Sequence, residues 1–263
     1  MRASLFSTGM ALLTITAAAT VAAKSHRPVA CITWLAIPSV PVSPALGMQT
    51  QTYGFNASDA AKLDEAIAAT KTVVTHPTFV NRLAAVSNLY NHVEPTLTLL
   101  GGAPFLSAYE ANRVCVNYVK DSPLKNETGH TGFPPAPCAV THLKASVVER
   151  WHGTDPAGMV SRACVINTIA HEWTHTLAQT DGHEMVTDDG HEDSPYPLVS
   201  YTVGAVAQCA FLLDYGLLTP GHFEACVDGA GSRDFYENTC TLTWLNSIEN
   251  GTSHANCSPD AGP

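Results

Sequence analysis

The chain has few basic residues for its length. Its 263 residues include 13 lysines and arginines against 23 aspartates and glutamates, which gives a formal net charge of −10 at pH 7. The basic residues form no cluster. Proteins that bind nucleic acid or an anionic membrane concentrate positive charge on one surface. We therefore expect neither of these partners.

The chain also lacks any C-x-x-C pair, so a cysteine zinc site or a thioredoxin-like redox pair is not expected. Eight cysteines are nevertheless present, and all of them follow the N-terminal apolar stretch: Cys31, Cys115, Cys138, Cys164, Cys209, Cys226, Cys240 and Cys257. An even number of cysteines in an exported chain predicts up to four disulfide bonds. Their pairing cannot be read from the sequence.

The first 23 residues resemble a secretory signal. Arg2 supplies a positive start, an apolar stretch follows from Leu5 to Val21, and small residues precede Lys24. We expect cleavage there, a secreted or periplasmic protein, and no stable membrane insertion afterwards. Residues 24–55 are rich in proline, serine and valine, which indicates an extended arm with one strand near Ile32 to Ile37. The main domain is expected at 56–263.

Hydrophobic periodicity predicts an α+β fold for that domain. Helices are expected from Asn56 or Ser58 to about Thr72, from Pro77 to about Tyr90, and from Val203 to Leu218. His76 and His92 are assigned ordinary roles at helix ends. Strands are expected at Thr96–Leu100, Arg113–Lys120, Ala139–Leu143 and Ser146–Arg150. Residues 121–137 and the part beyond Thr219 are predicted to be loops.

The motif that organises the chain is His171-Glu172-Trp173-Thr174-His175. Asp155 and Pro156 are typical of a helix start, and apolar residues recur after them at helical spacing. On a helix, histidines four residues apart lie about 40° apart around the axis and one turn apart along it, so both can reach one ion. Glu172 would lie beside them and accept a proton from a water.

This H-E-x-x-H helix resembles that of the zincin metallopeptidases, which implies Zn²⁺ held by His171 and His175 with Glu172 as catalytic base. The wider pattern is similar to the metzincins, H-E-x-x-H-x-x-G-x-x-H or Asp in the last place, so the resemblance implies Asp181 as third ligand. Ala178 stands where that family has glycine. A left-handed turn at alanine costs on the order of 1 kcal/mol.

A second possibility is that the helix continues to Thr180 and the chain turns at Gly182. A straight helix would place Asp181 about 240° around and about 9 Å along from His175, out of reach of the ion. The third ligand would then come from the acidic loop that follows: His183, Asp188, Asp189 or His191. An aspartate in a Thr-Asp-Asp run also resembles, more weakly, the aspzincin peptidases.

Two further segments bear on a peptidase site. Ser200-Tyr201-x-x-Gly204 resembles a segment that passes beneath the metal in secreted zincin-like proteins, and Tyr201 could donate its hydroxyl to an oxyanion or simply fill the core. Residues 141–150 could form the edge strand that binds substrate backbone, or a core strand.

These features together predict an exported zinc metallohydrolase, most simply an endopeptidase acting on a peptide or protein substrate. The alternative is a non-catalytic secreted module in which the helix is structural or a fourth protein ligand closes the zinc site.

Overall fold

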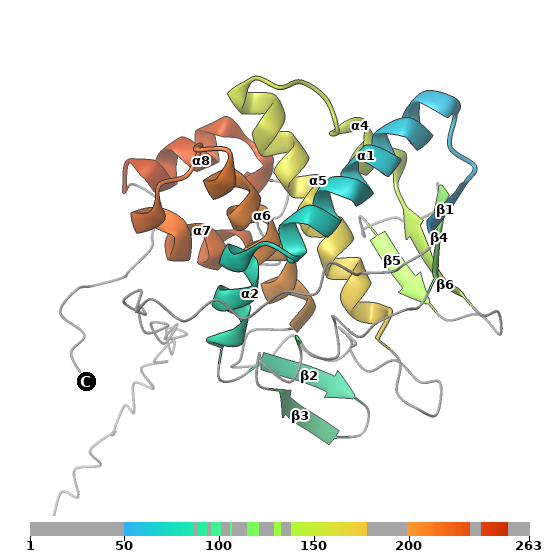
Figure 1. Ribbon diagram of the computed structural model, residues 1–263, viewed down its shortest axis with the longest axis horizontal. Helices are drawn as coiled ribbons and strands as arrows, with labels where there is room; N and C mark the ends of the chain where they lie inside the picture. Colours follow the sequence, from blue (N-terminus) through green and yellow to red (C-terminus); the bar gives the residue numbers. More distant parts are fainter. Residues whose placement is uncertain are drawn as a thin grey trace, which may run out of the picture.

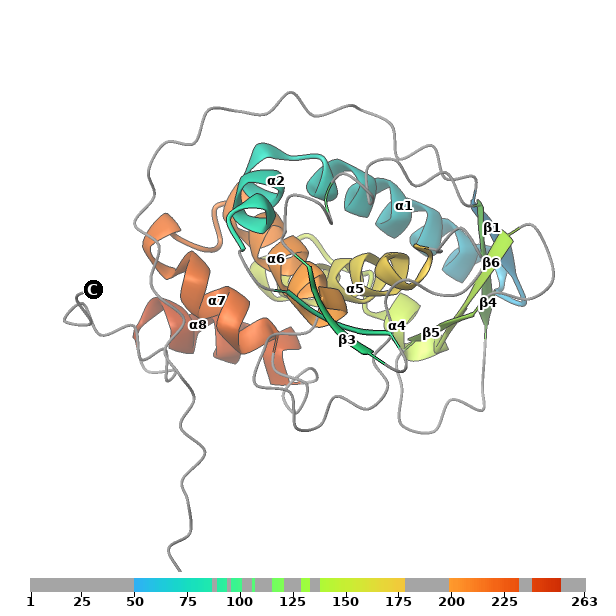
Figure 2. The same ribbon diagram turned by 90° about the horizontal axis from the view of Figure 1, so that it is seen from below.

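The computed structural model describes residues 50–86, 89–93, 96–100, 106, 115–120, 129–132, 138–177, 199–231 and 238–251. The predicted signal and most of the predicted arm lie outside these residues. Within them the fold is a mixture of helices and strands, which confirms the α+β class. Two views at right angles place a four-stranded sheet at one end of the molecule, α7 and α8 at the other, and α5 between them (Figures 1 and 2).

The central helix is α5, Pro156–His175. Its start was predicted correctly: Asp155 is the N-cap, and its side chain accepts a hydrogen bond from the backbone N–H of Gly158 at 3.0 Å. Such a cap satisfies one of the four N–H groups that a helix start leaves without partners. Most of the helix is buried, since α6 (Val199–Asp214) packs along one side and α1 (Ala57–Val74) lies against another.

The sheet has the strand order β1-β4-β6-β5. The three neighbours β1, β4 and β6 are parallel, while β5 pairs with β6 in the antiparallel direction. Their bounds are Thr50–Tyr53, Cys115–Lys120, Cys138–Leu143 and, for β5, Gly129–Gly132. The strands β4 and β6 therefore confirm two predictions, β1 falls inside the predicted arm, and β5 falls inside the segment predicted to be a loop.

The segment 141–150 does not form an edge strand, so that prediction is wrong. Its first part belongs to β6, which lies between β4 and β5. Its second part is α4, Ala145–Glu149. Val147 and Val148 have high strand propensity, but both are buried. Consecutive residues of a strand point to opposite faces, whereas a helical turn can bury both against the neighbouring helices α1 and α5.

The second predicted helix is shorter than expected. α2 ends at Ala84, and the following residues form β2, Leu89–Val93, which pairs with β3, Thr96–Leu100, as an antiparallel hairpin. Tyr90 and His92 therefore lie in a strand, where backbone pairing with β3 replaces helical hydrogen bonds. His92 is not at a helix end, and that prediction is wrong.

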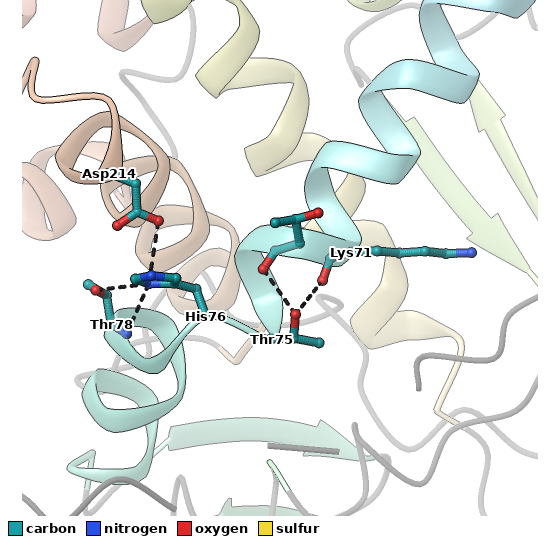
Figure 3. Close-up of polar contacts among 6 residues, drawn as sticks. Lys71, Thr75, His76, Thr78 and Asp214 are labelled. Carbon is teal, nitrogen blue, oxygen red and sulfur yellow. Dashed lines mark hydrogen bonds and ion pairs between the residues drawn. The ribbon is translucent and has the colours of Figure 1, made fainter. Parts of the chain in front are cut away.

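His76 does cap α2, Pro77–Ala84, as predicted. Its Nδ1 accepts from the backbone N–H of Thr78, and the same nitrogen lies 3.4 Å from a carboxylate oxygen of Asp214 (Figure 3). Burial raises the pKa of Asp214, and the nearby His76 opposes that rise. This contact ties the junction of α1 and α2 to the end of α6.

The C-terminal part is helical rather than looped, which corrects the prediction beyond Thr219. It contains the 3₁₀ turns η1 and η3 and the helices α7 and α8: Pro220–His222, Asn238–Cys240, Phe223–Ala230 and Leu242–Glu249. Arg82 of α2 reaches Glu224 of α7 with a two-pronged ion pair, Nε to Oε1 at 2.7 Å and Nη2 to Oε2 at 2.6 Å. Because Arg82 is only 8% exposed, this pair joins two helices from distant parts of the chain.

Three disulfide bonds connect the described elements: Cys115–Cys138, Cys164–Cys240 and Cys209–Cys226. The first links neighbouring residues of β4 and β6, the second ties α5 to η3, and the third ties α6 to α7. Disulfides persist in oxidising compartments, so they support an extracytoplasmic location. Cys31 and Cys257 lie outside the described residues, and none of the helices described is long and apolar enough to span a membrane.

Candidate metal and active site

The C-terminal end of α5 brings the two motif histidines together. The Nε2 atoms of His171 and His175 lie 3.3 Å apart, and their ring planes are inclined at 64°. Two nitrogens bound to one tetrahedral zinc ion at about 2.0–2.1 Å would be separated by about 3.3–3.4 Å. The side chains therefore fit two of the ligand positions of such an ion. The same distance would also allow one neutral imidazole to donate a hydrogen bond to the other.

Glu172 points toward the sheet and is held there. It is 3% exposed, and its Oε2 accepts a hydrogen bond from the hydroxyl of Thr131 on β5 at 2.7 Å. The Thr131 hydroxyl lies 2.8 Å from the hydroxyl of Thr141 on β6. A buried carboxylate is costly without hydrogen bonds, and these two threonines supply them from adjacent strands.

Gly129 makes room for this carboxylate. A Cβ atom built on Gly129 would lie 2.5 Å from Oε1 of Glu172 and 2.9 Å from its carboxyl carbon. Atoms this close would overlap, so any other residue at position 129 would displace the glutamate or the strand. The start of β5 and the motif glutamate thus fit together only because one of them has no side chain.

A buried aromatic pair supports the helix beneath the motif. Trp173 and Tyr118 are fully buried, and the indole Nε1 of Trp173 donates to the phenolic oxygen of Tyr118 on β4. Burial raises the pKa of Tyr118; the hydrogen bond from Trp173 lowers it, and the negative charge of Glu172 raises it further. Tyr118 therefore stays protonated across the physiological range and anchors α5 to the sheet.

Tyr201 is placed beside the first histidine, one turn into α6. Its ring meets that of His171 edge to face, with centroids 4.8 Å apart and planes at 87°. This edge-to-face geometry is favourable for aromatic rings. The prediction that the Ser200-Tyr201-x-x-Gly204 segment lies close to the motif agrees with this contact.

Close packing of α5 and α6 explains how Tyr201 reaches His171. A Cβ atom on Gly204 would overlap the side-chain oxygen of Asn167 and lie 3.0 Å from the Asn167 carbonyl oxygen. The Asn167 amide donates to Oε1 of Gln208 at 2.7 Å, so it is fixed in the interface. One turn along each helix from this contact lie His171 and Tyr201.

The predicted third ligand and its alternatives lie outside the described residues: Asp181, His183, Asp188, Asp189 and His191, together with Ala178. In the described part of the chain, no group of three His, Cys, Asp or Glu side chains is arranged to hold a metal ion. The helix itself ends at His175, with Thr176 as its C-cap. The alternative in which it continues straight to Thr180 is therefore wrong.

Sequence reasoning missed Thr131, Thr141 and Gly129 as site residues. The segment Gly-His-Thr-Gly of β5 is short, lies between proline-rich stretches and has no hydrophobic alternation. Only its position opposite α5 reveals its role, and a strand pairing of this kind leaves no local signal.

Compared with known protein families, curated proteins and solved structures, the chain gives no match in any of the three. The functional argument therefore depends on the geometry of the site.

Proposed function

We propose that the protein is an exported zinc-dependent metallohydrolase, most simply an endopeptidase that acts on peptides or proteins. The observation that supports this most is the convergence of the two motif histidines, with nitrogens at 3.3 Å, beside a glutamate on the same helix. The three disulfide bonds support export.

His171 and His175 would hold the ion, with Asp181 as the third ligand. When bound, zinc would act as a Lewis acid on a peptide carbonyl and lower the pKa of a water toward 7. The residues of the chain would do the rest. Glu172 would accept the proton and deliver it to the leaving amine. Tyr201, packed against His171, would offer its hydroxyl to the developing oxyanion.

The outer strand β5 is the candidate surface for substrate. It pairs with β6 on one side and lies at the end of the sheet order, directly above Glu172. An extended peptide could add to such an edge through backbone hydrogen bonds. This strand takes the role first assigned to residues 141–150.

The test is Glu172→Gln, with Glu149→Gln as the matched control on the exposed surface of α4. We expect both variants to bind zinc. Hydrolysis of a casein or gelatin substrate should fall by at least about 100-fold in Glu172→Gln, because the amide cannot accept the proton, and should be unchanged in the control. Retained hydrolysis in Glu172→Gln would refute the mechanism.

The burial of Glu172 is the observation that favours the alternative, a non-catalytic secreted module. A glutamate that is 3% exposed and hydrogen-bonded to Thr131 could serve only to join helix and sheet. Anomalous diffraction at the zinc edge on the chain from Lys24 onward separates the two. Three protein ligands and a water support the hydrolase, whereas four protein ligands make the zinc structural and support the module.

A further inference from the structure

The hydroxyl groups of Thr131 and Thr141 form a chain that ends on Glu172. We propose that Thr131, backed by Thr141, is a positioning residue: it fixes the Glu172 carboxylate in one orientation beside His171 and His175 and leaves Oε1 as the oxygen that accepts the proton. This inference rests on the proposed hydrolytic function.

The direction of the hydrogen bonds follows from the chemistry of the groups. An ionised carboxylate only accepts, so the bond of 2.7 Å to Oε2 must use the single proton of the Thr131 hydroxyl. Thr131 then has only its lone pairs for Thr141, which must donate across the 2.8 Å contact. Thr141 is fully buried and Thr131 is 4% exposed, so water does not compete for either bond.

The two oxygens of Glu172 consequently have different surroundings. Oε2 is occupied by Thr131, while Oε1 is the oxygen closest to Gly129, where no side chain intrudes. A general base must be held within hydrogen-bond reach of the proton that it removes, and a loose carboxylate loses that geometry. Thr131 restricts the carboxylate without using the oxygen that would react.

The backbone places Thr131 for this purpose. It is directly opposite Thr141 in the antiparallel pairing of β5 with β6, so the two hydroxyls share one face of the sheet. That face is covered by α5, which carries Glu172. Both threonines lie at least 31 residues before the motif helix position they serve, as their sequence numbers show.

The experiment compares Thr131→Val, Thr131→Ser and Thr72→Val in the full chain, with zinc content measured for each. Valine has nearly the shape of threonine and suits a strand, but it lacks the hydroxyl. We expect Thr131→Val to lower kcat by about 10- to 100-fold, the effect of one hydrogen bond to a charged group, with KM little changed. Thr131→Ser should restore kcat to within about threefold of the wild type.

Thr72→Val is the matched control, because the Thr72 hydroxyl bonds only to a carbonyl of its own helix, at an exposed position on α1. It should leave kcat unchanged. If Thr131→Val is poorly folded, Thr141→Val tests the same chain one step further from Glu172 and should give a smaller loss of kcat.

The outcomes separate the two hypotheses. A wild type that binds zinc and hydrolyses nothing would refute the proposed function and the positioning role with it. An active wild type whose kcat is unaffected by Thr131→Val would refute the positioning role alone. So would equal losses in the valine and serine variants, or a loss of zinc in Thr131→Val, because then the hydroxyl does not act through Glu172.

Discussion

Replacing Gly204 with alanine is a sharp test of how α5 and α6 pack. The new Cβ atom would overlap the side-chain oxygen of Asn167 and approach its backbone oxygen to 3.0 Å. Asn167 is held by Gln208, so it cannot swing aside without breaking a buried hydrogen bond of 2.7 Å. Either that bond is lost or the two helices move apart.

The magnitude follows from these two routes. Leaving the two buried amides unpaired costs about 2–4 kcal/mol in total, and overpacking the interface costs a similar amount. Alanine regains about 1 kcal/mol of helix propensity over glycine. The free energy of unfolding should therefore fall by about 1–3 kcal/mol, which lowers Tm by about 3–10 °C in a domain of this size.

The matched control is Gly221→Ala in the 3₁₀ turn η1, where a Cβ atom would meet nothing within 4 Å. Thermal unfolding followed by circular dichroism should show this variant within about 2 °C of the wild type, because no packing changes and the unfolded chain becomes slightly less flexible. The separation of the helices in Gly204→Ala should also move Tyr201 away from His171. Equal Tm values for the two alanine variants would refute the packing argument.

Two further predictions concern the contacts that join distant elements. Arg82→Met leaves Glu224 without its two-pronged partner in a largely buried site, so the free energy of unfolding in urea should fall by about 3–5 kcal/mol, whereas Lys62→Met, which breaks the more exposed pair with Asp59, should cost less than about 1 kcal/mol; similar losses would contradict the assigned burial. Replacing both members of Cys164–Cys240 by serine should cost about 4.5 kcal/mol and both members of Cys209–Cys226 about 3 kcal/mol, because the first bond closes a loop of 76 residues and the second one of 17; the reverse order would show that loop entropy in the unfolded chain does not dominate.

Local signals in the sequence were enough to predict α1 and α5. Asn56 and Asp155 each begin a helix with a side chain that accepts from a backbone N–H three residues later. Proline at the first helical position and apolar residues at helical spacing complete the signal for α5. Nothing in the rest of the fold was needed for these helices, and for this reason the motif histidines could be placed on one face in advance.

The partners of the motif could not be predicted in this way. Thr131 is 41 residues before Glu172, and Tyr201 is 30 residues after His171. Their contacts depend on strand register and on helix packing at Gly204, which are determined by the whole fold. Ser146–Arg150 failed for a related reason: its propensity favours a strand, but burial of two consecutive valines favours a helical turn.

The end of α5 bears on the third ligand. Asp181 would be about 9 Å along and on the opposite side from the histidines only if the helix ran straight on past His175. The structure ends the helix at His175, and the Thr176 hydroxyl bonds back to the carbonyl of Trp173 at 2.7 Å. The objection to Asp181 based on a continuous helix therefore no longer applies. A helix that stops directly after its second histidine keeps both imidazoles on its last turn and leaves the following residues free of the helical geometry that would exclude them from the ion.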